Sequence, residues 1–179
     1  MTALLDRDFL IKNLCFMYRL IVASAPLLEF AIPRSRGELR EYYEKHYAEE
    51  VGHDAMLLRD LHSLGIKDIP FDYTATQLAG AQYYLIAHHH PALLIGYMMV
   101  MEGSPLSAET IKDAEATHDC ELTVLRHHSA HDRLHFKDLE QIRASMTPEL
   151  QDAIAWNAAA VRQILNAEFE RWAHAEQHH

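Results

Sequence analysis

Apolar residues recur at helical spacing along nearly the whole chain, and no segment shows the sustained period-two alternation of a strand. Residues 6–32 predict a long first helix, which Pro33 ends, and Ser35 is a candidate cap for the next helix. Residues 37–65 predict one uninterrupted helix with Gly65 as its C-terminal cap. The first third of the chain should therefore form two long helices.

The middle of the chain continues the helical pattern but is interrupted by proline. A helix is expected from Thr74 or Thr76 to about His89. Pro91 breaks or kinks it before an almost wholly apolar segment that runs to Glu102. This apolar segment permits contact with an aliphatic chain but does not require it.

The last third predicts two further helical regions. Ser107 is a candidate cap for a helical pattern that reaches about residue 144, with a break expected near residues 118–120. Pro148 occupies the first position of a final helix. The sequence thus predicts an all-α fold, a single domain over residues 1–179 with a helical bundle of about six or seven helices.

Three polar residues stand on the apolar stripe of the predicted helix that ends near residue 144. His128, Asp132 and His135 are offset by four and seven residues, so they share nearly one helix face. Burying a carboxylate and two imidazoles is costly unless a partner compensates, and a bound metal ion compensates well. A hydrogen-bonded core network or a solvated histidine-rich face is the alternative. We predict metal ligation.

A second apolar stripe, within residues 37–65, also carries ligand-type side chains. Glu50 and His53 are three residues apart and can reach one metal site. Glu49 lies further off the stripe and is expected beside the ligands or exposed, whereas His46 is either a ligand or a hydrogen-bonding partner of one. Glu102 ends its apolar segment without a local ion-pair partner.

The predicted ligands therefore number three carboxylates and three imidazoles: Glu50, His53, Glu102, His128, Asp132 and His135. This set can hold two iron ions and leave positions open for dioxygen. Oxygen and imidazole donors suit iron or manganese, and no thiolate cluster indicates zinc or an iron–sulfur centre.

Composition narrows the function further. The 179 residues carry a net charge of −10 and no basic cluster, which argues against binding to nucleic acid or to an anionic membrane surface. Cys15 and Cys120 are too few for a disulfide framework, so a cytoplasmic location is expected. Lys12, Asn13 and Arg19 interrupt the first apolar segment, and we expect neither a signal peptide nor a membrane span.

The segments His46–Asp54 and Tyr97–Glu102, followed by the His-x-x-x-Asp-x-x-His motif, resemble the heme oxygenase-like diiron oxidases and oxygenases, also described as iron-containing redox enzymes. The resemblance covers roughly residues 20–142. It implies a seven-helix bundle of the heme oxygenase type, without haem, that holds two irons between its core helices. Some members carry a further Glu where this chain has Tyr43, and His46 or water is expected to complete the site instead.

The resemblance also implies an activity. Diferrous members of the family react with dioxygen and oxidise small substrates, by N-oxygenation of amines or by oxidative decarboxylation or C–C cleavage of amino or fatty acids. Such an enzyme needs an external electron donor. The resemblance suggests a homodimer, which the residue pattern itself does not address.

Two other functions compete with this interpretation. Glu115-x-x-His118 together with Glu50-x-x-His53 would give a ferritin-like diiron pair, but Glu102 is too close to Glu115 in the chain to lie on an antiparallel partner helix. The second competing function is that of a metal-free protein with the same fold. Such a protein would be a thiaminase-like hydrolase with Cys120 as nucleophile, or a small-molecule-binding protein.

Overall fold

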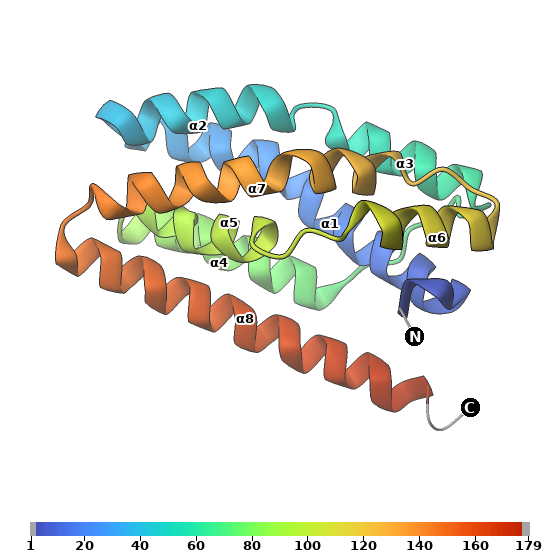
Figure 1. Cartoon of the computed structure of the whole chain (residues 1–179). Helices are drawn as coiled ribbons and strands as arrows, with labels where there is room; N and C mark the ends of the chain where they lie inside the picture. The colour runs from blue at the N-terminus through green and yellow to red at the C-terminus, as the bar shows by residue number, and fades with distance from the viewer. Residues whose placement is uncertain (1–2, 177–179) are drawn as a thin grey trace.

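The computed structural model describes residues 3–176, with side chains as far as residue 173, and this part of the chain is almost wholly helical (Figure 1). Within it there is no strand, so the predicted all-α fold is confirmed. His178 and His179, to which the sequence assigns no function, lie outside the described residues.

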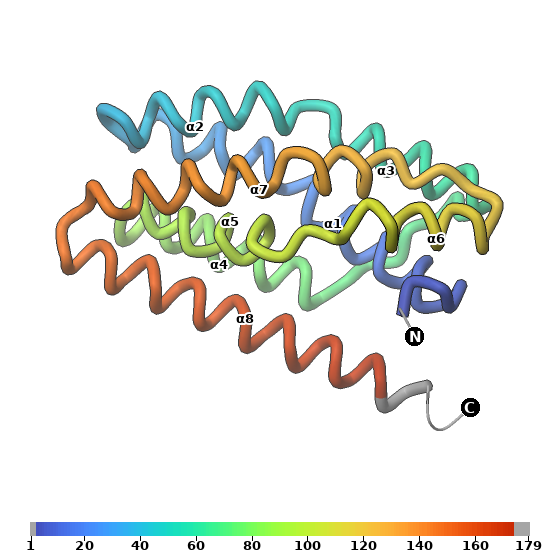
Figure 2. Tube along the Cα trace, viewed as in Figure 1, coloured from blue at the N-terminus to red at the C-terminus, as the bar shows by residue number. Residues whose placement is uncertain are grey.

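Eight α-helices follow one another in the described chain, with short 3-10 turns at Ala3–Leu5, Ile32–Arg34 and Pro91–Leu93. The helices are α1 (Arg7–Ala31), α2 (Gly37–Glu50), α3 (His53–Ser63), α4 (Tyr73–His88), α5 (Leu94–Glu102), α6 (Ala108–His118), α7 (Thr123–Ala144) and α8 (Pro148–Glu176). The central helix α1 packs against α2, α3 and α4, while α5 packs between α7 and α8. In Figure 2, α2 and α3 follow each other along one side of the bundle and α8 runs along the other.

The prediction of a single helix over residues 37–65 is wrong, because the helix is interrupted at Val51 and Gly52. Val51 is extended, and Gly52 has a φ of 96°, a left-handed conformation that suits glycine best. This break gives eight helices where about six or seven were expected. The predicted apolar stripe nevertheless continues across it, since all of its members are buried: Leu39, Tyr43, His46, Glu50, His53, Leu57, Leu61 and Leu64.

The predicted caps at Gly65 and Ser107 are confirmed. Gly65 has a φ of 85° and closes α3, with its N–H bonded to His62 O and that of Ile66 bonded to Leu61 O, both at 3.0 Å. Ser107 caps α6 by accepting a hydrogen bond from the N–H of Thr110.

The predicted cap of α2 is wrong and the predicted start of α4 is late, although α2 does begin at Gly37 as expected. The Ser35 hydroxyl donates to Ala31 O at 2.9 Å and does not cap α2. The helix expected from Thr74 or Thr76 begins at Tyr73, because the side chain of Asp72 accepts from the N–H of Ala75 at 2.7 Å. The start of α4 therefore follows from the side chain of Asp72, whereas no side chain caps α2.

The start of α7 is fixed by side chains from other helices. Asp60 on α3 is buried and accepts a hydrogen bond from the N–H of Val124 at 2.9 Å. Glu115 on α6 accepts from the N–H of Leu122 at 2.8 Å. These carboxylates cap a helix whose own preceding residue offers no cap. They set the position of α7 against α3, and so the position of the histidines one turn further along.

The apolar content of α1 reflects its central place. The segment Arg7–Arg34 is long and apolar enough, by composition alone, to cross a membrane. Within the bundle, however, α1 buries Leu10, Leu14, Phe16 and Leu27 against its neighbours. A helix with apolar residues over most of its surface is expected at the centre of a globular bundle.

The close approach of α5 to α8 depends on Gly96, and we expect Gly96→Ala to be destabilising. A Cβ there would overlap the carbonyl oxygen of Ile154 and lie 3.0 Å from Ala158 N. Overpacking of this kind should lower the free energy of unfolding by about 1–3 kcal/mol, measurable by urea denaturation.

Gly80→Ala is the matched control. Gly80 is exposed on α4, and nothing lies within 4 Å of a Cβ added there. This change should raise stability by about 0.5–1 kcal/mol, because alanine favours helix. Equal effects of the two changes would contradict the close packing of α5 on α8.

Candidate metal centre

Four helices bring all six predicted ligands into one region. Helix α2 supplies Glu50, and α3 supplies His53 as its first residue. Glu102 is the last residue of α5, and α7 carries the remaining three. His46, which the sequence left as an additional ligand or partner, lies among them with an exposed fraction of only 3%.

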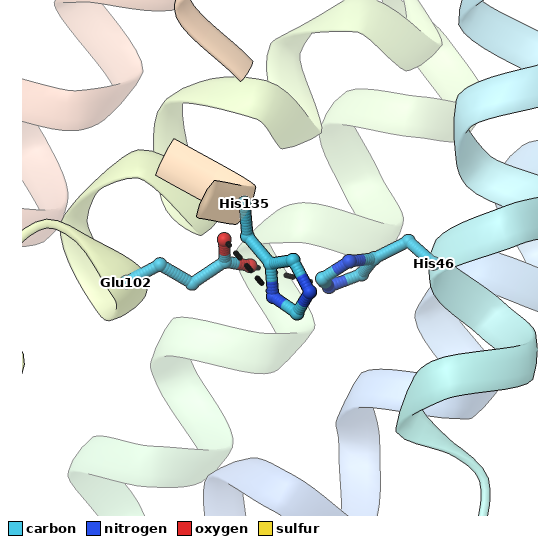
Figure 3. A group of neighbouring side chains, drawn as sticks. All are labelled: His46, Glu102 and His135. Carbon is cyan, nitrogen blue, oxygen red and sulfur yellow. Dashed lines mark ion pairs between the residues drawn. The ribbon is translucent and has the colours of Figure 1, made fainter. Parts of the chain in front are cut away.

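One half of the centre is formed by His46, Glu102 and His135, which face one another from α2, α5 and α7 (Figure 3). Their donor atoms all lie within 4.8 Å of one another. His46 Nε2 is 3.2 Å from Glu102 Oε1, and His135 Nδ1 is 3.9 Å from Glu102 Oε2. The arrangement is one in which two imidazoles and a carboxylate can bind a single ion.

Glu49 lies at the outer edge of this half. Its carboxylate is partly exposed, 3.4 Å from His135 Nε2 and 3.7 Å from His46 Nδ1. The structure therefore places it beside the imidazoles and nearer to solvent than Glu50, as its position off the stripe suggests.

The other half contains Glu50, His53 and His128. Glu50 Oε1 lies 3.4 Å from His53 Nδ1, and the rings of His53 and His128 are 5.1 Å apart. The same Glu50 oxygen lies 3.7 Å from His46 Nε2. Glu50 thus stands between the two halves, where a carboxylate could serve an ion in either.

Asp132 is bonded to a histidine of its own helix. Its Oδ1 lies 3.0 Å from His128 Nδ1, one turn away. A proton on Nδ1 that is donated to Asp132 leaves the lone pair of Nε2 free. Among the described residues, that Nε2 is buried and has no hydrogen-bond partner. A carboxylate that orients a histidine in this way is typical of metal sites.

Other buried donor atoms of the centre are also without hydrogen bonds among the described residues. They are His46 Nδ1, His53 Nδ1 and Glu102 Oε2, together with the hydroxyl of the adjacent Tyr42. Each buried polar atom left in this way costs roughly 1–3 kcal/mol. Nitrogen and carboxylate oxygen atoms are the donors that iron and manganese accept, so the residues present fit such an ion.

The ionisation of these groups depends on their neighbours. Burial raises the pKa of Glu102, and the opposing hydrogen bond from His46 does not offset it. Burial alone would lower the pKa of His46, but its hydrogen bond to Glu102 and the nearby carboxylates raise the pKa above its ordinary value. Burial alone would raise the pKa of Glu50, but the nearby imidazoles of His53, His46 and His128 lower it below its ordinary value. In the metal-free protein, the carboxylates of the centre are therefore stabilised mainly by the neighbouring imidazoles.

A cavity of about 530 Å³ adjoins the centre. Its wall includes polar side chains of the centre, among them Glu50, Glu102 and His128. Elsewhere apolar side chains of α1, α5 and α8 form the wall. Met98, which belongs to the hydrophobic core, and Met101, which packs against that core, also line this cavity.

Sequence reasoning missed two tyrosines near the centre. The ring of Tyr42 is stacked on that of His46, with centroids 5.6 Å apart. Tyr97 is buried, lines the cavity and lies close enough to Glu50 for that carboxylate to raise its pKa, although burial raises it more. The spacing of Tyr42 one turn before His46 was the signal that could have found the first of them.

The residues of the competing interpretations lie elsewhere. Glu115 binds Leu122 N and Arg126, and His118 Nε2 lies 2.9 Å from Leu4 O. They serve local structure rather than a second Glu-x-x-His half-site. Burial raises the pKa of Cys120, and it is not part of the cavity wall, so its environment does not favour a nucleophilic thiolate.

Comparisons with known proteins agree with this architecture. Residues 14–166 match the family described as iron-containing redox enzymes. A crystal structure of a domain of unknown function with a heme oxygenase-like fold, from Shewanella denitrificans OS217, superposes with a TM-score of 0.75. At 18% identity, 97% of this chain and 81% of that chain are covered, so the predicted heme oxygenase-like fold is confirmed. A search of curated proteins gives no significant match.

Because the buried donors lack partners, we expect metal binding to stabilise the fold. Anaerobic Fe²⁺ at a hundred times its dissociation constant should add about 2.7 kcal/mol to the free energy of unfolding. Thermal melts with Fe²⁺, with Mn²⁺ and with a chelator measure the effect. Mg²⁺, which prefers oxygen ligands, is the control. An identical melting temperature under all four conditions would contradict a metal centre here.

Proposed function

The chain belongs to the family of iron-containing redox enzymes, and from this membership and the geometry of the centre we propose that it is a non-haem diiron oxidase or oxygenase. The observation that carries the proposal is the group of buried imidazole and carboxylate atoms that have no hydrogen-bond partner among the described residues. A hydrogen-bonded polar core would not leave so many donors unpaired at one place.

Two groups of ligands would hold the two ions. His46, Glu102 and His135 form the first group, on the evidence of their mutual distances. Glu50, His53 and His128 form the second group, and Asp132 orients His128 through its contact with Nδ1. Glu50 lies between the groups and is suited to contact both ions.

Ferrous ions bound there would supply the electrons and open coordination positions that dioxygen reduction requires. The protein's own residues position and protect this chemistry. Asp132 fixes the ring of His128, and the apolar wall built by α1 and α5 keeps water from the reacting end of the substrate. An external electron donor must restore the reduced state between turnovers.

The substrate that we propose is a small molecule with a substantial apolar part. The cavity wall combines carboxylate and imidazole groups of the centre with a larger number of aliphatic, aromatic and methionine side chains. An amine, amino acid or fatty acid can place its reacting carbon or nitrogen beside these carboxylate and imidazole groups. Free thiols at Cys15 and Cys120 are compatible with the reducing cytoplasm that we propose as its location. A homodimer remains a proposal from the resemblance.

Metal stoichiometry tests the diiron assignment. Anaerobic loading should give about two irons per chain, as expected for a two-metal site, and an oxygen pulse should produce a transient visible absorption band. His128→Ala or Asp132→Ala should abolish uptake at one site and leave circular dichroism largely unchanged. His62→Ala, an exposed change on α3, is the control. Two irons retained in either test variant would refute the assignment.

A series of alkylamines of increasing chain length tests the cavity. Affinity should rise by about 0.8 kcal/mol for each added methylene until the cavity is filled. Leu20→Phe narrows the wall and should weaken only the longer members, without loss of iron. Leu134→Phe is the matched control, because Leu134 is exposed on α7. Affinities that do not depend on chain length would contradict a substrate role for the cavity.

A further inference from the structure

A second row of histidines lies on α7 beside the face that carries the metal centre. His131 is exposed and His127 is partly buried one turn before it. Their rings are stacked, with centroids 4.3 Å apart and planes inclined by 26°. The ring of His127 in turn contacts that of His53, with centroids 4.6 Å apart. The ring contacts therefore connect the exposed His131, through His127, to the predicted ligand His53.

The spacing of this pair suits a divalent transition-metal ion. Two histidines four residues apart on one helix face form a common metal-binding arrangement. At the inner end of the row, His53 is only 3% exposed, and its Nδ1 is buried without a hydrogen-bond partner among the described residues. His135 lies one turn beyond His131, with ring centroids 6.4 Å apart. Imidazoles of the row therefore adjoin both halves of the centre.

The cavity beside the centre is a poor route for a hydrated cation. There the wall of the cavity is largely apolar, and a hydrated ion would have to give up its water ligands before any replacement became available. On the α7 side, imidazoles can replace the water ligands one at a time. The partly exposed Glu49 beside His135 adds negative charge on this same side.

We propose that His127 and His131 form a capture site, which takes divalent transition-metal ions from solvent and delivers them to His53 and His135. The inference rests on the proposed function, because it assumes that the buried centre holds metal. The pair accelerates loading of the centre and is not part of its final ligand set.

The test is the rate at which metal-free protein takes up Co²⁺, used as an air-stable probe and followed by its visible absorption in a stopped-flow instrument. The double variant His127→Gln/His131→Gln keeps the size and polarity of the side chains but removes both imidazoles. At low Co²⁺ concentration it should load roughly tenfold more slowly, because local ion capture raises association rates. Its final stoichiometry should equal that of the unmodified protein.

His62→Gln, an exposed histidine on α3, is the matched control and should load at the normal rate. A double variant that loads at the normal rate to the normal stoichiometry overturns the capture role. A double variant that binds fewer ions at equilibrium also overturns it, since the pair would then be ligands of the final site. Unmodified protein that takes up no Co²⁺ and no Fe²⁺ refutes the proposed function itself, which is a distinct result.

Discussion

The burial of several ionisable side chains between four helices is the constraint on which the rest of this structure depends. His46, Glu50, His53 and Glu102 are each less than a tenth exposed. An isolated charge in such a place is costly, and the neighbouring imidazoles and carboxylates compensate only in part. Burial raises the pKa of Glu102 despite its contact with His46, in line with incomplete compensation. Metal ions between the helices would supply the missing positive charge.

Helix periodicity was sufficient to predict most of the fold, because the spacing of apolar residues in an amphipathic helix shows which face is buried. Periodicity did not predict the helix boundaries that depend on a single glycine or on one or two capping hydrogen bonds. A glycine inside a helix costs only about 1 kcal/mol, so Gly52 did not signal a break. Ser35 had the right residue type for a cap, but its hydroxyl bonds to the preceding turn. The caps on α7 from Asp60 and Glu115 come from other helices and leave no local signal.

The residues of the candidate centre were predictable for the same reason as the helices. A polar side chain on a buried stripe must have a partner, and the stripes identified such side chains on three segments of the chain. Their mutual pairing was not predictable, since it depends on how the helices pack. The contact of His46 with Glu102 joins residues distant in sequence. The cavity was not predictable for the same reason, because its wall is formed jointly by α1, α5 and α8.

Helix α7 gives the centre two different surroundings, because its histidines occupy two adjacent faces. His128 and Asp132 face the apolar cavity, whereas His127 and His131 continue toward solvent. An organic substrate and a hydrated cation need opposite environments, the first a dry wall and the second polar ligands at each step. A bundle that offered one opening for both would have to make the wall polar and so lose affinity for the substrate. In the function that we propose, the two faces of α7 would remove that conflict, since metal and substrate would approach the same carboxylates from different sides.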